Sequence, residues 1–407
     1  MKAVIQKWNK LSLIVRIAIG LVLGAILGVL VPGASAISVL GDVFVGALKA
    51  IAPVLVFILV MSSLANANGA VGKRFSRVVV LYMLSTCLAA FLAVIGCFAF
   101  PVTIRLTDAV DNTAPTGIWE VLGGLLTNMV ANPVSAIMNG NYVGILTWAI
   151  IFGIALRQLA GEATKKTVKD FSDAVSQAVR WIINCAPFGI FGLVFTNVST
   201  NGLEIFTEYG KLLALLVGCM LAVALIVDPL IVAICLRRNP YPLVFKCFKE
   251  SGLTAFFTRS SAANIPINMN LCEKLGLDKD FYSVSIPLGA TINMDGAAIT
   301  ITVMALTVAN TMGIVVDIPT AFILAVIATL GACGASGVAG GSLLLIPLAC
   351  SLFGIGNDVA MQAVAVGFII GVVQDSLETA INSSGDVIFA ATAEFMDWKK
   401  EGKELPF

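Results

Sequence analysis

Apolar residues in this chain fall into long, continuous runs separated by short polar joints. The runs cover residues 11–31, 37–65, 78–100, 121–156, 181–198, 211–236, 281–310, 320–352 and 359–373, and the last continues to residue 393. About 20 apolar residues suffice for a helix to cross the hydrocarbon core of a bilayer. The runs lack the roughly ten-residue alternation of a membrane barrel, so they predict an all-α polytopic membrane protein embedded in the lipid bilayer.

The polar joints alternate in charge along the first six runs. Basic residues concentrate at 2–16, 73–77, 157–169 and 237–249, whereas the joints 32–42, 101–120 and 199–211 are poor in them. Basic loops stay on the cytoplasmic side of a membrane. We therefore expect six spans within residues 1–240, with a cytoplasmic N-terminus and a basic cytoplasmic tail at 396–407. The run 11–31 is too long for a signal-peptide core and is expected to be a retained first span.

Two segments of the second half are too polar or too rich in glycine to be plain spans. LTAFFTRSSAANIPINMNL (253–271) has a serine-rich middle, and GACGASGVAGGS (331–342) has a tip of Gly, Ala and Ser between apolar arms. Glycine in a helix costs about 1 kcal/mol relative to alanine. Both segments are typical of re-entrant hairpins, where irregular backbone lines a cavity near a substrate site. A small-residue packing face is the alternative for the second.

Composition narrows the function classes. The 407 residues are 58% hydrophobic and 12% charged, with a net charge of +1 and no histidine. The charge balance gives no sign of a nucleic-acid partner. The absence of histidine excludes Ser–His and Cys–His catalysis. Because the sequence also lacks a GxxxxGK[ST] phosphate loop, direct coupling to ATP is unsupported.

The stretch QDSLETAINSSGD (374–386) places polar groups on one helix face. Asp375, Thr379, Asn382 and Asp386 are spaced 4, 3 and 4 apart, and Glu378 borders the same face. Each carboxylate at mid-bilayer costs about 2.5–3.5 kcal/mol. Arg259 is the one base at membrane depth in this half of the chain, so the other acids need mobile cations, a cationic substrate group or protons.

Three further polar islands interrupt apolar runs. PLGATINMDGAA (287–298) holds Asn293 and Asp295 between helix breakers, and broken helices free carbonyl oxygens for Na⁺. Tyr82, Ser85 and Thr86 lie in LYMLSTC, where hydroxyls usually bond back to the backbone. Asp228 precedes Pro229, and a helix kink explains it as well as a functional role does.

Together these motifs resemble a known family. TRSSAANIPINM, NMDGAA, the glycine-rich segment and DSLETAINSSGD follow one another as in the dicarboxylate/amino acid:cation symporters, which comprise the glutamate transporters and their bacterial relatives. The similarity covers residues 240–395 and extends to the number of preceding spans. Within the family the chain is most similar to bacterial sodium-coupled transporters of serine and threonine.

The resemblance implies eight transmembrane helices, two re-entrant hairpins and a homotrimer in the bacterial inner membrane. Spans 1, 2, 4 and 5 would form a scaffold. Spans 3 and 6 would join the transport core at 241–395, which holds hairpin 1, span 7, hairpin 2 and span 8, and this unit would move as an elevator.

The resemblance also implies site residues. The substrate amino group would meet Asp375 near Thr379, and its carboxylate would meet Asn382 and the hairpin tips at Ser261 and from Val338 to Gly340. One Na⁺ site would use Asp386 with carbonyls of Gly289, Asn293 and Asn382. A second would use Asp295, Asn293, Ser85 and Thr86. A third would use carbonyls of Thr291 and of Ala332 to Ala335.

Two departures from the family pattern bear on the substrate. Transporters of acidic amino acids carry Arg where this chain has Glu378, and Thr where it has Ala297. A second substrate carboxylate would be repelled by Glu378 and would lose its bidentate donor. A small neutral amino acid such as serine or threonine is expected, and Glu378 is expected to pair with Arg259. Ala339 replaces a proline often found at the tip of the second hairpin.

The main expectation is therefore a secondary symporter that imports serine and threonine with Na⁺, and not an enzyme. A proton-coupled symporter of small neutral amino acids is the alternative, because the carboxylate stripe can carry protons. An intramembrane hydrolase using Ser260 or Ser261 would lack both a histidine and a lysine at membrane depth that could activate the serine. A passive channel would call for a pore built by a symmetric assembly.

Overall fold

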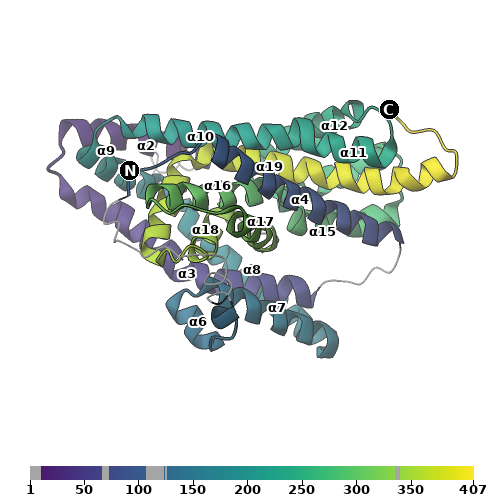
Figure 1. Cartoon of the computed structure of the whole chain (residues 1–407), viewed down its shortest axis with the longest axis horizontal. Helices are drawn as coiled ribbons and strands as arrows, with labels where there is room; N and C mark the ends of the chain where they lie inside the picture. The colour runs from purple at the N-terminus through teal and green to yellow at the C-terminus, as the bar shows by residue number, and fades with distance from the viewer. Residues whose placement is uncertain (1–10, 67–72, 107–122, 124–125, 335–339) are drawn as a thin grey trace.

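The longest helix of the computed structural model is α19 (Asn357–Lys400), which runs along most of a helical bundle (Figure 1). The structure describes residues 11–66, 73–106, 123, 126–334 and 340–407, and every regular element in these ranges is helical. The all-helical prediction is therefore confirmed for the described residues.

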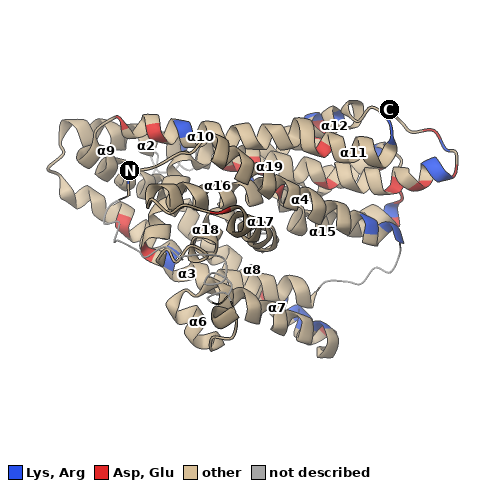
Figure 2. Ribbon diagram, in the orientation of Figure 1, with Lys and Arg blue, Asp and Glu red and all other residues tan. Residues whose placement is uncertain are grey.

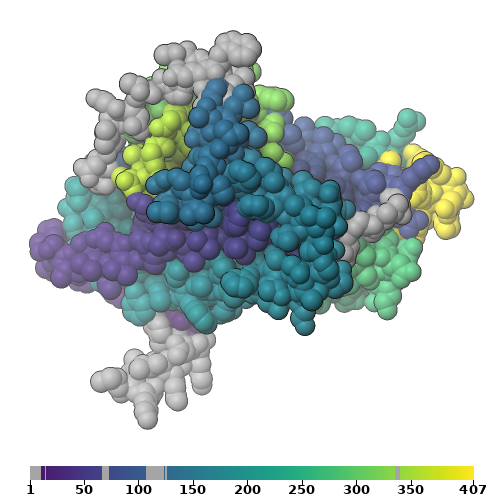
Figure 3. All heavy atoms as spheres, turned by 90° about the horizontal axis from the view of Figure 1, so that it is seen from below, coloured from purple at the N-terminus to yellow at the C-terminus, as the bar shows by residue number. Residues whose placement is uncertain are grey.

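A first group of helices comes from the N-terminal half of the chain. Its members are α2 (Leu13–Leu30), η1 (Ser35–Ile37), α3 (Ser38–Ala65), α6 (Pro133–Asn139), α7 (Tyr142–Leu159), α8 (Glu162–Asn184) and α9 (Ala186–Asn201). α2 packs along α9, and α3 packs against α7, α8 and α9. Seen from below, purple α3 crosses this face between the blue and teal atoms of the later helices (Figure 3).

The contact between α2 and α9 depends on three glycines spaced four apart. If Gly20 carried a Cβ, that atom would lie 2.3 Å from the Pro187 carbonyl oxygen, and a Cβ on Gly24 would lie 2.6 Å from the Phe191 carbonyl oxygen. At Gly28 it would lie 2.9 Å from the Val198 Cβ. Small residues at four-residue spacing let helix backbones approach closely in a membrane. The glycine stripe of the first apolar run therefore sets how α2 docks.

A second group surrounds α19. It contains α4 (Lys73–Ala99), α10 (Ile205–Ala222), the π-turn η2 (Val223–Val227), α11 (Asp228–Leu236), α15 (Lys279–Ile292) and α16 (Asp295–Thr311). α16 packs against α4, α19 and α17 (Ile318–Ala332), and α10, α11 and α15 also contact α19. The most apolar windows of α15–α16 and α19 are 94% and 83% buried, against 39–50% in the other four candidate spans. The helices that carry most of the predicted site are therefore the innermost ones.

Broken helices occur where the sequence predicted them. The segment 253–271 forms α13 (Leu253–Thr258) and α14 (Ser261–Lys274), which follow α12 (Tyr241–Cys247) and the π-turn η3 (Phe248–Gly252). α15 and α16 are separated at Asn293 and Met294. The glycine-rich segment follows α17 (Ile318–Ala332) and precedes η4 (Ser342–Leu345) and α18 (Ile346–Ser351).

Two predicted boundaries are wrong. The run 121–156 is not one helix, because Gly140 is left-handed with φ 64° and separates α6 from α7. The basic joint after residue 156 is mostly helical: α8 begins at Glu162 as an amphipathic helix and meets α9 at a bend of 51°. A polar outer face hid this helix from a search for continuous apolar runs.

Among the described residues, six helices are long and apolar enough to cross a membrane, or seven if bent α8–α9 is one span. α2 and α17 are shorter apolar helices. The count of eight spans with two re-entrant hairpins stays a prediction.

Candidate functional site

Asp375 of α19 lies against the break between α13 and α14. Its Oδ2 accepts a hydrogen bond from Arg259 Nε at 2.6 Å and lies 2.6 Å from Arg259 Nη2. Its Oδ1 accepts the Gly340 N–H at 3.1 Å. Arg259 has a left-handed backbone (φ 52°) that ends α13, and Nη2 also donates to the Gly371 carbonyl at 3.3 Å. The helix break thus places the Arg259 guanidinium against Asp375, the carboxylate predicted to bind the substrate amino group.

Glu378 lies one turn further along α19 and has neutral partners. Its Oε2 accepts hydrogen bonds from Thr300 Oγ1 at 2.7 Å, Ser342 Oγ at 2.9 Å and Gln374 Nε2. The expected pairing of Glu378 with Arg259 is wrong, because the guanidinium reaches Asp375 instead. Glu378 is 5% exposed, so it is a buried carboxylate held by three uncharged donors.

Asn382 joins α19 to the start of α16. Its Oδ1 accepts the Gly296 N–H at 2.8 Å, and its Nδ2 contacts the Met294 sulfur at 3.4 Å. Thr379 donates its hydroxyl to the Asp375 carbonyl at 2.7 Å, in the usual back-bonded manner of a helical threonine. Ser261 is buried at the first turn of α14.

Asp386 is surrounded by amides from two other helices. Asn293 Nδ2 donates to Oδ1 at 3.3 Å and Asn268 Nδ2 donates to Oδ2 at 3.4 Å. An ideal Cβ on Gly289 would lie 2.8 Å from Asp386 Oδ1, so the Gly289 backbone faces this carboxylate. The Tyr82 hydroxyl donates to the Asp386 carbonyl at 3.0 Å. The end of α15 and the side of α14 therefore close around Asp386.

Asp295 forms a separate centre at the first residue of α16. Its carboxylate accepts hydrogen bonds from Thr86 Oγ1 at 2.7 Å and from Ser85 Oγ, both on α4. Thr86 Oγ1 in turn accepts the Met294 N–H at 3.1 Å. Ser85 Oγ also lies 3.1 Å from Asp228 Oδ1. Ser85 and Thr86 thus face Asp295, as the family resemblance implied. Asp228 is a further carboxylate at this centre that the resemblance did not imply.

The described residues of the third implied site are Thr291 on α15 and Ala332 to Gly334 at the end of α17. Thr291 donates its hydroxyl to the Leu288 carbonyl at 2.7 Å, and Cys333 Sγ lies 3.6 Å from the Ile292 carbonyl oxygen. This contact brings α17 beside the residue that follows Thr291. The remaining predicted positions, Ala335 and Val338, lie outside the described residues.

Negative charge exceeds positive charge in this part of the bundle. Besides Glu394 near the end of α19, five carboxylates are buried along α11, α16 and α19: Asp228, Asp295, Asp375, Glu378 and Asp386. Among the described residues only Asp375 of these five forms an ion pair, with Arg259. Figure 2 shows Lys and Arg gathered toward helix ends, whereas acidic segments also occur within the bundle. Buried carboxylates without a basic partner need a cation or a proton.

Sequence reasoning missed a polar network that connects α14 to α19. Asn264 and Asn268 both donate to Ser383 Oγ, at 2.8 and 3.0 Å, and Asn268 also donates to the Ser383 carbonyl at 3.0 Å. Ser251 of η3 donates to Asn268 Oδ1. The four-residue spacing of the two asparagines in AANIPINM was the available signal, because it places both on one helix face. Thr300, Ser342 and Gln374 carried no comparable signal.

An all-helical bundle whose broken helices meet at unpaired buried carboxylates has the features of a membrane transporter. The family model of the sodium:dicarboxylate symporter family matches residues 13–395 of this sequence. The chain therefore belongs to this family, and it is a multi-pass membrane transporter and not an enzyme.

Curated relatives match over nearly the whole chain. A protein of Bifidobacterium adolescentis named serine/threonine transporter SstT is 60% identical over 406 residues, with 100% of this chain and 94% of the relative covered. A protein of the same name from Streptococcus agalactiae is 58% identical over 396 residues, with 97% and 98% covered. One from Streptococcus thermophilus is 55% identical over 402 residues, with 98% and 100% covered.

Proposed function

We propose that the protein is a secondary symporter that imports serine and threonine together with Na⁺, the transported coupling ion. The observation that carries the proposal is the set of buried carboxylates on three helices, one of them paired with Arg259 and the others held by neutral donors. The family membership and the names of the relatives support the substrate class.

Glu378 is the basis for a neutral substrate. Its carboxylate sits one helical turn from Asp375 and faces Thr300 and Ser342. Ala297, next to the Gly296 N–H that bonds Asn382, adds only a methyl group. A substrate with a side-chain carboxylate would meet negative charge there, whereas a hydroxyl can donate to Glu378.

Asp375 is proposed to bind the substrate ammonium group. Both of its oxygens have partners, Arg259 on one and the Gly340 N–H on the other. The ammonium group would take the Arg259 position, since two cations at this one carboxylate would repel each other. The proposed exchange couples substrate entry to movement at the tip between α13 and α14.

Sodium coupling is proposed for three sites, two of which contain a carboxylate. Each of these two combines one carboxylate with uncharged oxygen ligands at a helix break. The first has Asp386 with Asn293 and Gly289, and the second has Asp295 with Ser85 and Thr86. Hard cations such as Na⁺ prefer oxygen ligands, and broken membrane helices supply them. The third implied site, at Thr291 and Ala332 to Ala335, is part of the same proposal.

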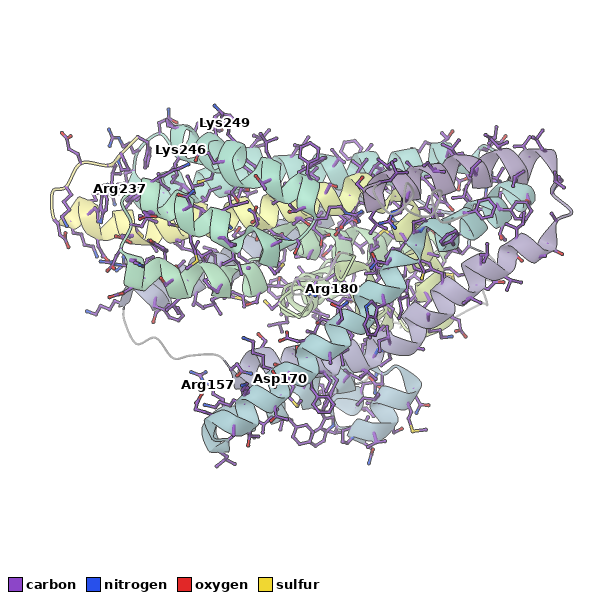
Figure 4. All side chains as sticks on the ribbon, turned by 180° about the vertical axis from the view of Figure 1, so that it is seen from behind. Arg157, Asp170, Arg180, Arg237, Lys246 and Lys249 are labelled. Atoms are coloured by element: carbon purple, nitrogen blue, oxygen red, sulfur yellow. The ribbon has the colours of Figure 1, made fainter. Side chains whose placement is uncertain are left out.

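We extend the proposal to topology and assembly. Arg237, Lys246 and Lys249 lie toward the end of the bundle where α19 ends (Figure 4), and basic loops favour the cytoplasm. The C-terminus is therefore proposed to be cytoplasmic, and the basic residues at 2–16 favour the same side for the N-terminus, in a bacterial inner membrane. α2 and α3 expose apolar side chains such as Val22, Val29 and Val43 to their surroundings, which suits a homotrimer with a scaffold of spans 1, 2, 4 and 5 and a moving unit of the rest.

The test is uptake of labelled serine into proteoliposomes that contain the purified protein. The external salt is NaCl or choline chloride, and the competitor is unlabelled threonine or aspartate. We expect uptake that requires Na⁺ and is blocked by threonine but not by aspartate. Competition by aspartate would contradict the role of Glu378. Full uptake in choline chloride with an imposed pH gradient would support proton coupling instead.

A further inference from the structure

Asp228 lies at the junction of two helices, facing the Asp295 centre. It begins α11, directly after the π-turn Val223–Val227, and its N–H donates to the Val223 carbonyl five residues back. π-turns within helices occur often at functional sites. The Asp228 side chain is 0% exposed, and its Oδ1 lies 3.1 Å from Ser85 Oγ. The π-turn and Pro229 thus aim a carboxylate at the same α4 hydroxyl that Asp295 contacts.

The hydrogen-bond donors around this pair are too few. A serine hydroxyl has one hydrogen, yet Ser85 Oγ lies within hydrogen-bond distance of both Asp228 and Asp295. Asp228 Oδ2 is buried with no hydrogen-bond partner, and the Asn293 Oδ1 is in the same condition. Within the described ranges, no Lys or Arg forms an ion pair with Asp228 or Asp295. Two buried carboxylates that share one hydroxyl repel each other unless a positive charge lies beside them.

We propose that Asp228 is a second carboxylate of the cation site at Asp295, so that Na⁺ is held there by ligands from α4, α11 and α16. This inference rests on the proposed sodium coupling and adds a residue to it. The orphaned Asp228 oxygen supplies a ligand, and its charge increases the attraction for a monovalent cation. Removing a unit charge near a partly buried cation weakens binding by about tenfold or more.

The experiment measures Na⁺ binding through thermal unfolding of the purified full-length protein. NaCl is varied against choline chloride at constant ionic strength, since a ligand that binds the native state raises its unfolding temperature. The variants are Asp228→Asn, which removes the charge at constant shape, and Glu394→Gln. Glu394 is an equally buried carboxylate, but it bonds the Asp278 N–H and Trp398 and lies outside the proposed site. Asp228→Ser serves as a second uncharged variant if Asp228→Asn does not fold.

We expect Na⁺ to raise the unfolding temperature of the wild type, with the half-maximal NaCl concentration about tenfold or more higher in Asp228→Asn and unchanged in Glu394→Gln. In Glu394→Gln the KM for serine uptake at saturating NaCl should stay at the wild-type value. Coincident NaCl curves for wild type and Asp228→Asn would overturn the inference and indicate that Asp228 carries a permanent proton. A wild type indifferent to NaCl would refute the sodium coupling itself.

Discussion

Arg259 and Asp375 form an ion pair at 2.6 Å across the junction between the α13–α14 break and α19. The two residues are 116 positions apart in the chain, and their side chains are 12% and 4% exposed. Arg259, the base that the sequence places at membrane depth in this half of the chain, is therefore already paired with the carboxylate proposed to receive the substrate ammonium group. If the substrate ammonium group binds Asp375 as proposed, substrate binding is an exchange of partners with Arg259.

The first prediction concerns Arg259→Gln. Removing one partner of a buried ion pair costs about 3–5 kcal/mol, because the other charge stays buried and unpaired. We expect a lower unfolding temperature without substrate and a larger stabilisation by serine, whose ammonium group replaces the lost cation. Thermal unfolding with and without serine measures both. Arg105→Gln, at an exposed pair with Glu204 and Glu208, is the control and should leave both values nearly unchanged. A serine effect no larger than in the wild type would argue against exchange at Asp375.

The second prediction concerns Asp375→Asn. The amide keeps the shape of the side chain but cannot neutralise an ammonium group in a buried site. We expect serine uptake to be abolished while the protein is still produced and inserted. Ser384→Ala is the matched control on the same helix, because the Ser384 hydroxyl bonds back to the Ala380 and Ile381 carbonyls of its own helix. Normal serine uptake by Asp375→Asn would refute the amino-group assignment.

The third prediction concerns Glu378→Gln. A hydrogen bond to a charged group contributes about 1.5–3 kcal/mol. The KM for a substrate with a hydroxyl group should therefore rise about tenfold or more. Alanine has no hydroxyl, and its KM should change little. Uptake of labelled serine and alanine by the same proteoliposomes gives the ratio of the two effects. An unchanged ratio would mean that Glu378 does not contact the substrate side chain.

The fourth prediction concerns packing between α2 and α9. In Gly24→Ala the new Cβ would lie 2.6 Å from the Phe191 carbonyl oxygen. Because backbone must shift to relieve that contact, we expect a loss of about 1–3 kcal/mol in stability. Gly46→Ala makes the same change in α3 where no atom lies within 4 Å, and alanine favours a helix there. Thermal unfolding of the two variants should diverge in opposite directions from the wild type, and equal midpoints would contradict the close docking of α2.

Much of the helical architecture was predictable because helix formation in a membrane depends on local properties. Long apolar runs gave most of the helices, and glycine, proline and serine clusters predicted the breaks after Thr258 and Ile292. The search for apolar runs missed α8, because its polar face breaks the hydrophobic pattern of a span. It also missed Gly140, where one left-handed residue divides an apolar run. Both features depend on packing against neighbouring helices, which the hydropathy of continuous segments does not describe.

The sequence by itself determined that the interior would hold more acids than bases and that Asp375, Thr379, Asn382 and Asp386 would share a helix face, because composition and the 3.6-residue period need no tertiary information. Only the tertiary structure decided the partners. Arg259 reaches Asp375 and not Glu378 because its left-handed backbone at the end of α13 aims the side chain toward Gly371 and Asp375. Asp228 faces Ser85 because α11 packs inside the bundle, 143 positions from its partner. Ion-pair choice depends on distances of a few ångströms between separate helices, and these are fixed only when the helices pack.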